Sequence, residues 1–334
     1  DTDWRGWHLR SYYASEPEIY HDFIDFLALL KYDTLCLEVN DMLQYESHPE
    51  VAREGAPTKE QLRDLVEYAR ERHFRVFPQL ATFAHFGYVL NKPQWRHLAE
   101  APEGTTLGNR DRFNYCPSNP ETYPLVFDLM EELIDVFGGE YFHIGHDEAT
   151  FDDIGTCALC QGKDPGELFV GDIIKLHDWL AERGMRTLMW GDMFLPSHNG
   201  MKYGTAALTD ELPGDILICD WHYSSNYDFD ASLSYWEEHG FEALGCPWYE
   251  PQNVWGFAEA VHEHNEVGLL GTTWSSVDSA LTTLPHLPPG WLLGAENSWT
   301  VDKPTVENLG WLPIPTFNRL WRLNDGPQPR GVRL

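Results

Sequence analysis

The sequence predicts an α/β fold, a (β/α)8 barrel, because short apolar segments alternate with amphipathic helical segments along the 334-residue chain. Eight apolar segments have strand-like lengths: residues 6–9, 34–39, 75–80, 141–144, 186–190, 215–221, 242–247 and 268–273. Parallel strands need long crossovers, and a repeat of this kind closes a sheet on itself. The alternative is an open, doubly wound sheet. Such a sheet normally has fewer repeats and a glycine-rich phosphate-binding turn, which this sequence lacks.

Helices are expected between the strands, where apolar residues recur at spacings of three and four. Residues 19–30 carry one such stripe. Three pairs have the capping-box spacing that starts a helix: Ser15 with Glu18, Thr58 with Gln61, and Ser118 with Glu121. Glycines follow several of the predicted helix ends, as expected for the residue that most readily adopts a left-handed backbone.

The domain organisation follows from two long connections and a change of composition. Residues 82–117 and 194–213 are too long for ordinary turns, and long loops at one barrel end usually build a substrate pocket. Residues 1–284 are expected to form a single barrel domain. Residues 285–334 are rich in Pro and Trp without clear periodicity, and we expect a C-terminal extension packed on the barrel, which either wraps it or seals its last helix position.

Acidic residues outnumber basic ones by 53 to 23, which gives a formal net charge of −30. Such a surface repels phosphate backbones and anionic lipid headgroups, so neither nucleic acid nor a membrane is an expected partner. No stretch of about 20 apolar residues could span a bilayer. The first residues lack the layout of a signal peptide, although a processed one could already be missing. The sequence leaves open whether the chain forms a homodimer.

The six cysteines indicate a reducing, cytoplasmic location. Cys36, Cys219 and Cys246 lie in apolar strand-like segments, as reduced core thiols usually do. Cys157 and Cys160 form a CxxC pair in a polar loop. Zinc is not expected there, because neither a second CxxC pair nor a nearby pair of histidines accompanies it.

The strongest chemical signal is at residues 141–148, where an apolar strand runs directly into two carboxylates, Asp147 and Glu148. The carboxyl ends of barrel strands converge on the active site. Alternation along the strand places His143, Gly145 and Asp147 towards the barrel axis, whereas Glu148 falls where the strand gives way to a loop. Two neighbouring carboxyl groups in a partly dehydrated pocket cannot both ionise easily, so the pKa of one is raised. The pair then consists of a protonated acid beside a charged carboxylate.

A metal site is the competing interpretation, since His143, His146, Asp147 and Glu148 are all ligand types. Positions i and i+3 of a strand point to opposite faces, unlike the i and i+4 pair of a zinc-protease helix. We therefore expect no metal and no organic cofactor.

The other strand ends carry aromatic and charged residues suited to a sugar. Four tryptophans occupy equivalent positions and could wall an apolar box: Trp190, Trp221, Trp248 and Trp274. A single tryptophan is more often core, but four at strand ends are hard to explain by packing. Arg5 and Asp192 suit charge-assisted hydrogen bonds to hydroxyls, with a structural salt bridge as the alternative for each.

Several segments together resemble one enzyme family. Residues 143–148 read His-Ile-Gly-His-Asp-Glu, and residues 79–85 end in His85. Residues 116–118 and 190–192 fit the same pattern. The chain is similar here to the family 20 glycoside hydrolases, the β-N-acetylhexosaminidases. It is most similar to their hexosaminidase D-like branch, which lacks the small α/β domain usual ahead of the TIM barrel.

The resemblance implies a retaining exo-glycosidase that uses substrate-assisted catalysis, in which the acetamido oxygen of the sugar attacks its own anomeric carbon. By this resemblance Glu148 protonates the leaving oxygen and then activates water. Asp147 holds the acetamido N–H and steadies the oxazolinium ion. A tyrosine should donate to the acetamido oxygen, with Tyr223 the first candidate and Tyr249 the second.

The resemblance also assigns residues to sugar binding. Arg5 is similar to the family arginine that grips the ring hydroxyls, and His85 and His143 are similar to buried supporting histidines. The N-acetyl methyl is expected to lie against the four tryptophans named above. The expected partner is a glycan or glycoconjugate with a terminal β-GalNAc or β-GlcNAc.

Three departures from the family pattern bear on specificity. His146 replaces the second Gly of the motif, and residues 83–85 replace a Gly before His85. Ser276 stands two residues after Trp274, where the family often has a glutamate that binds O4 or O6. The choice between GalNAc and GlcNAc therefore stays open, with a lean towards GalNAc from the hexosaminidase D-like branch. A metal-dependent barrel hydrolase and a non-catalytic amino-sugar-binding barrel remain the alternatives.

Overall fold

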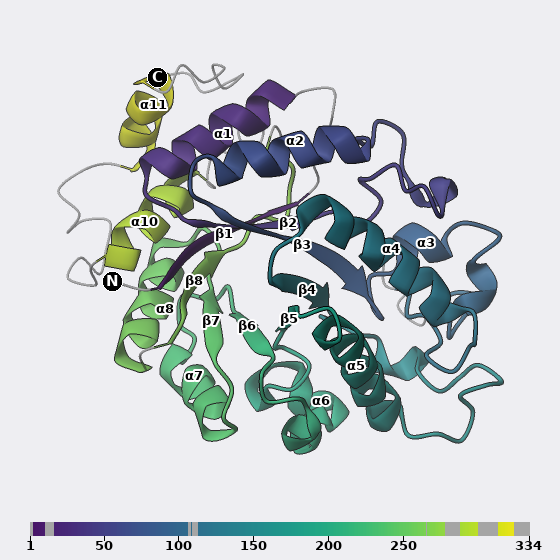
Figure 1. Cartoon of the computed structure of the whole chain (residues 1–334). Coiled ribbons are helices and arrows are strands. Elements are labelled where there is room, and N and C mark those ends of the chain that lie inside the picture. The colour runs from purple at the N-terminus through teal and green to yellow at the C-terminus, as the bar shows by residue number, and fades with distance from the viewer. Residues whose placement is uncertain are drawn as a thin grey trace.

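The predicted barrel is confirmed. A computed structural model describes residues 3–10, 17–105, 108, 113–264, 266–277, 288–299 and 313–323. Its strands pair in parallel, each with the next in sequence, and β8 closes onto β1 (Figure 1). The strands are β1 (Trp4–Arg10), β2 (Thr34–Glu38), β3 (Arg75–Thr82), β4 (Tyr141–Gly145), β5 (Arg186–Trp190), β6 (Leu217–Trp221), β7 (Ala243–Cys246) and β8 (Gly268–Gly271).

Helices surround the barrel. The longer ones are α1 (Pro17–Leu29), α2 (Lys59–Arg70), α4 (Thr122–Phe137), α5 (Pro165–Ala181), α7 (Phe229–Glu238), α8 (Pro251–His264), α10 (Pro288–Trp299) and α11 (Pro313–Leu323). The connections after β2 and β3 contain η1 (Pro49–Val51), α3 (Gly87–Leu90) and η2 (Arg96–Leu98), and η4 (Phe151–Asp153) follows β4. After β5 the chain forms η5 (Pro196–Gly200), α6 (Met201–Tyr203) and η6 (Thr205–Glu211) instead of one long helix. Within the ranges given above, no helix is long and apolar enough to cross a membrane.

Of the three predicted capping boxes, one is present, one is absent, and that of Ser15 with Glu18 involves a residue outside the described ranges. Thr58 and Gln61 exchange both hydrogen bonds at the start of α2. The predicted box of Ser118 and Glu121 is wrong, because α4 begins at Thr122 without a side-chain cap. The Ser118 hydroxyl instead contacts the Sγ of Cys160 at 3.1 Å, in a neighbouring loop.

The barrel does not end at residue 284. Helix α10 packs against α8, β8 and β1 and fills the position of the eighth barrel helix (Figure 1). Its Trp291 packs on Phe23 of α1 with ring centroids 4.6 Å apart, and its backbone oxygen accepts a hydrogen bond from Tyr32. Of the two placements expected for the extension, α10 has the second, since it seals the last helix position of the barrel.

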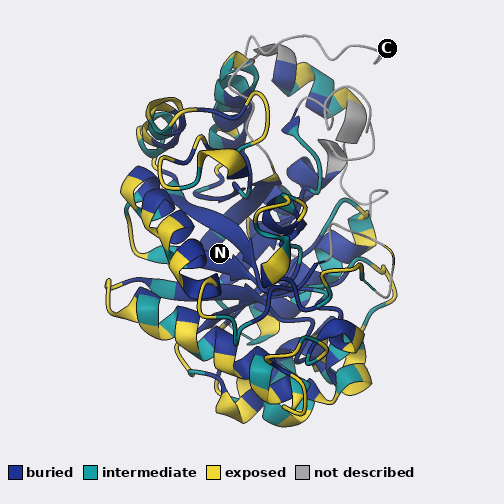
Figure 2. Ribbon diagram, turned by 90° about the vertical axis from the view of Figure 1, so that its right-hand side faces the viewer, coloured by how far each residue is buried: buried dark blue, intermediate teal, exposed yellow. Residues whose placement is uncertain are grey.

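Two apolar layers hold the barrel together. The strands and the inner helix faces are mostly buried, whereas exposed residues lie on the outer helix faces and in the loops (Figure 2). Inside the barrel a separate cluster is formed by Trp4, Cys36, Phe77, Leu188, Trp190, Leu217, Cys219, Leu244, Cys246 and Leu270. The barrel interior is thus a packed core, and a cavity can form only above it, at the strand ends.

Candidate active site

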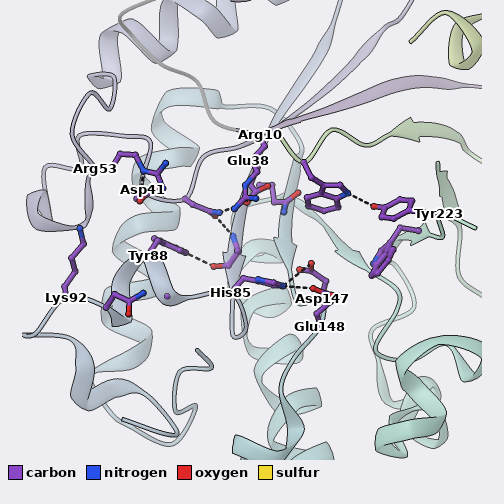
Figure 3. A pocket seen from close by; sticks show the side chains of 17 residues that line it. Arg10, Glu38, Asp41, Arg53, His85, Tyr88, Lys92, Asp147, Glu148 and Tyr223 are labelled. Carbon is purple, nitrogen blue, oxygen red and sulfur yellow. Dashed lines mark hydrogen bonds and ion pairs between the residues drawn. The ribbon is translucent and has the colours of Figure 1, made fainter. Parts of the chain in front are cut away.

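A cavity of about 770 Å³ opens at the carboxyl ends of the strands, where barrel enzymes bind their substrates (Figure 3). It is lined by Arg10, Glu38, Asn40, Asp41, Arg53, Gln79, Ala81, His85, Gly87, Tyr88, Asn91, Lys92, Asp147, Glu148, Trp221, Tyr223 and Trp274. Charged groups thus follow β1 to β4, while β6 and β8 contribute aromatic rings. One side suits hydroxyls and the other suits an apolar group.

A sharp turn after β4 brings Asp147 and Glu148 into this cavity. Gly145 has φ +77°, and a Cβ there would lie 3.0 Å from the Cα of Ala81 on β3, so glycine is required. His146 and Glu148 also have positive φ, of +69° and +49°. Non-glycine residues in this conformation cost about 1–3 kcal/mol each and cluster at functional sites.

His85 lies between the two carboxylates. Its Nε2 is 3.5 Å from Oδ2 of Asp147 and 3.4 Å from Oε2 of Glu148. Burial is the main cause that raises the pKa of Asp147, and His85 opposes it; with the added charges of Asp192 and Glu148 the pKa is about 6. The free site therefore holds a carboxyl group that titrates near neutrality beside a second, more exposed one.

Asp192 binds the backbone of Glu148 and is not among the residues that line the cavity. Its Oδ2 accepts hydrogen bonds from the backbone N–H of Glu148 at 3.1 Å and from Asn199 at 2.7 Å. Its Oδ1 accepts from the Trp221 indole at 3.3 Å. Burial raises the pKa of Asp192 to about 6, although these donors oppose the shift. Instead of a sugar hydroxyl, Asp192 contacts the turn and the ring that form the site.

Tyr223 lines the cavity, and its hydroxyl has two polar neighbours. The Trp274 indole N–H donates to the hydroxyl oxygen at 2.7 Å, and the Thr272 hydroxyl lies 3.2 Å from it. An indole N–H cannot accept, so the Tyr223 hydrogen is directed either to Thr272, whose hydroxyl also donates to the Pro247 carbonyl at 3.0 Å, or to a ligand in the cavity. The alternative tyrosine, Tyr249, packs edge-on against Trp248 and is not among the lining residues.

Of the four predicted tryptophans, Trp221 and Trp274 line the cavity. Trp190 is fully buried inside the barrel, 5.5 Å from the Trp274 ring and 4.5 Å from His143. Trp248 packs against Tyr223 with ring centroids 5.2 Å apart. The expected direct contact of Trp190 and Trp248 with the substrate is therefore wrong; both support the rings that face the cavity.

The prediction for Arg5 is also wrong. Arg5 lies near the amino end of β1, where it pairs with Asp33 at 2.5 Å and donates to the Lys31 carbonyl. Arg10, at the carboxyl end of the same strand, lines the cavity and lies 3.5 Å from Glu38. Position could have identified Arg10, because it follows the apolar segment 6–9 directly.

Glu38 and Asn40, at the carboxyl end of β2, form a polar group in the lining of the cavity. Asn40 donates to Oε1 of Glu38 at 2.6 Å, and His8 lies 3.4 Å from Oε2. Burial alone would raise the pKa of Glu38, but the hydrogen bond from His8 and the charge of Arg10 hold the pKa below its usual range. Glu38 is thus an anion that can accept hydrogen bonds.

The predicted metal set of His143, His146 and the two carboxylates is not assembled. His143 is buried, accepts the Gly145 N–H at 3.0 Å, and burial lowers its pKa well below the usual value. His146 Nε2 lies 2.9 Å from Asp172, a buried carboxylate on α5. The atoms that do approach one another, within 4.8 Å, belong to His85, Asp147 and Glu148.

The fold and the site together define a (β/α)8 barrel with adjacent carboxylates and an aromatic wall at its carboxyl face. A model of the glycosyl hydrolase family 20 catalytic domain matches residues 3–249. The chain belongs to glycosyl hydrolase family 20.

Individual relatives agree with this assignment. A β-hexosaminidase of Porphyromonas gingivalis is 29% identical over 147 residues, which cover 42% of this chain and 19% of the relative. Hexosaminidase D of Bos taurus is 25% identical over 222 residues, 64% of this chain and 61% of that protein. The chain spans less than half the length of several curated relatives that it matches, including 36% of a β-hexosaminidase of Emericella nidulans.

Solved structures share the fold. A chitobiase of Flavobacterium johnsoniae has a TM-score of 0.76 at 20% identity, covering 97% of this chain and 52% of that one. A family 20 exo-β-N-acetylglucosaminidase of Vibrio harveyi, in complex with N-acetylglucosamine, has a TM-score of 0.72 at 16% identity. It covers 98% of this chain and 59% of that one.

Proposed function

We propose that the chain hydrolyses terminal β-linked N-acetylhexosamines with retention of configuration, using the acetamido oxygen of the sugar as the nucleophile. The observation that carries the proposal is the placement of Asp147 and Glu148 side by side in the cavity, with the Tyr223 hydroxyl in the same cavity. Three roles are needed at one anomeric carbon, and these three groups supply them.

Glu148 is the proton donor and later the base. It is half-buried, lines the cavity, and is held at its backbone N–H by Asp192. In the first step its proton goes to the leaving oxygen as the anomeric C–O bond breaks and the acetamido oxygen bonds to that carbon. In the second step the Glu148 carboxylate takes a proton from water as the water opens the oxazolinium ring.

Asp147 stabilises the positive charge that this attack creates. The acetamido N–H becomes more acidic as its oxygen donates electrons, so a buried anion beside it is worth more in the transition state than in the ground state. The Tyr223 hydroxyl donates to the acetamido oxygen and holds it in line with the anomeric carbon. Trp221 and Trp274 enclose the acetyl group on the aromatic side.

Arg10 and Glu38 suit the ring hydroxyls, since one offers a fork of donors and the other an acceptor. We further propose a preference for GalNAc over GlcNAc. Its support is the resemblance to the hexosaminidase D-like branch and the presence of Ser276 where the family often places a glutamate.

The test compares aryl β-GalNAc, β-GlcNAc and β-galactoside as substrates of the full chain. Hydrolysis of the two N-acetylated glycosides, fastest for GalNAc, with a nearly inert galactoside, is expected. Equal hydrolysis of the galactoside would overturn the assisted mechanism. Loss of turnover on chelation with an unchanged Tm, and with a metal detected, would favour a metal-dependent hydrolase, and binding without turnover would favour a sugar-binding barrel.

A further inference from the structure

Three cysteines from two loops converge at a buried point outside the cavity. Cys116 belongs to the connection between β3 and α4, and Cys157 and Cys160 belong to the connection between β4 and α5. The Sγ of Cys116 lies 3.3 Å from that of Cys157 and 3.4 Å from that of Cys160. Cys116 thus contacts two other thiols, and a disulfide would use only one of them.

Glu100 completes the group with a carboxylate. One ligand atom from each of Glu100, Cys116, Cys157 and Cys160 lies within 4.8 Å of the others. A tetrahedral zinc ion with bonds of about 2.3 Å to sulfur separates its sulfur ligands by about 3.8 Å. The sulfurs would therefore move apart by only a few tenths of an ångström to enclose the ion.

The environment of Glu100 indicates that a cation is needed there. Its side chain is 1% exposed, and one oxygen accepts the N–H of Cys157 at 3.2 Å. The other oxygen, Oε1, is buried and has no partner at hydrogen-bond distance in the described part of the chain, although the Cys160 thiol adjoins the carboxylate. In those same ranges no Lys, Arg or His forms an ion pair with Glu100. A buried carboxylate without a counter-ion is costly, and a divalent ion at the thiols would compensate it.

The backbone around the CxxC pair has the form of a metal-binding turn. The N–H groups of Cys160 and Gln161 both donate to the Cys157 carbonyl, at 3.1 and 2.9 Å. The turn continues to Gly162, whose φ of +83° favours glycine. The turn thus holds the Cys157 and Cys160 sulfurs on one side, facing Cys116 and Glu100, with the two-residue spacing of structural zinc sites.

We propose that Glu100, Cys116, Cys157 and Cys160 bind one structural zinc ion, which ties the loop that carries His85 to the loop that begins with Asp147 and Glu148. Zinc is favoured over harder cations because three of the ligands are thiolates, and four protein ligands close the coordination shell. The ion is structural, because the site lies apart from the cavity residues. The proposal does not rest on the proposed activity.

The first test measures metal in the full chain, purified under reducing conditions after removal of any metal-binding tag. Elemental analysis should give about one zinc per chain, and replacement by cobalt should give the visible absorption of tetrahedral cobalt–thiolate. Absence of stoichiometric zinc after reconstitution would overturn the proposal. So would a disulfide that joins Cys116 to Cys157 or Cys160 in the protein isolated without reductant.

Variants then assign the ligands. Cys160→Ser should abolish stoichiometric binding, and Glu100→Gln, which keeps the shape but removes the charge, should weaken zinc affinity by at least about tenfold. The matched control is Cys219→Ser, a buried thiol of β6 in the barrel core, which should keep one zinc per chain. Equal loss of zinc in the control would contradict the assignment of the ligands. If a variant fails to fold, the cobalt spectrum of the wild type still tests the site.

Discussion

The same two loops carry two clusters of ionisable side chains, and the clusters differ in what surrounds them. His85, Asp147 and Glu148 face a cavity of about 770 Å³, whereas the Glu100 and cysteine cluster is closed over by its own loops. Judged only by their residue types, both clusters could bind a metal ion. The open cluster has hard oxygen ligands and room for a substrate, and the closed one has soft sulfur ligands and no such room.

The comparison teaches that accessibility and donor type, rather than the presence of acids and histidines, separate a reacting site from a structural one. The open cluster keeps strained backbone at residues such as His85 and Glu148, with φ of +52° and +49°. Strain of this kind persists only where the surroundings over-determine it. Asp192 below Glu148, and the proposed zinc ion further along the loop, are candidates for that support.

The largest expected effect is that of Glu148→Gln on substrates with poor leaving groups. Their kcat should fall by about 10²–10⁴, because the departing alkoxide then lacks a proton donor. Activated aryl glycosides, which need no proton, should be slowed much less. Steady-state kinetics on both substrate classes measure the difference, and equal losses on both would argue against the acid role.

Asp147→Asn should lower kcat on both substrate classes by about 10²–10³, because the oxazolinium charge loses its anion. The two variants together distinguish a proton donor from an electrostatic partner in the open cluster. If Asp147→Asn retained wild-type turnover, Asp147 would not stabilise the transition state. Circular dichroism of both variants should match the wild type.

The pH profile sharpens the comparison further. Burial raises the pKa of Asp147 to about 6, so the group loses its charge as the pH falls below that value. Since Asp147 acts as the anion, kcat/KM should fall as the pH drops below 6. The pKa of Asp192 is also about 6, and if Asp192 contributes, kcat/KM should fall more steeply with pH than the titration of one group allows. In the residual activity of Asp147→Asn the acid limb should become shallower, by the share that Asp147 contributes, and an unchanged limb would assign it to another group.

A smaller effect on turnover is expected from the closed cluster. Cys157→Ser should lower Tm by about 5 °C or more through loss of the metal, while kcat at low temperature stays within about threefold of the wild type. The reverse pattern, an unchanged Tm with abolished turnover, would place the cysteines in the chemistry. Thermal unfolding followed by kinetics on the same preparation measures both.

Much of the fold could be predicted, because alternation of strands and helices is a local signal. All eight strands are confirmed, and the motif at residues 143–148 places Asp147 and Glu148 correctly at the end of β4. The errors are of a different kind. Arg5 and Arg10 lie on the same strand, and only the direction of the chain through the barrel decides which one reaches the cavity.

The remaining errors depend on tertiary contacts. Trp190 and Trp248 lie at strand ends like Trp221 and Trp274, yet they pack behind other rings. Spacing along the chain does not distinguish a ring that lines the cavity from a ring that packs behind it. The CxxC pair seemed incomplete in the sequence because Cys116, 41 residues before Cys157, is brought to it by the fold alone.

The most direct test of the assisted mechanism is a series of aryl β-N-acetylhexosaminides whose acetyl group carries one, two or three fluorines. If the acetamido oxygen attacks the anomeric carbon, each fluorine withdraws electrons from the nucleophile, and kcat should fall steeply and progressively. A kcat that does not change along the series would mean that the attacking atom belongs to the protein or to water, and the account of the site would be wrong.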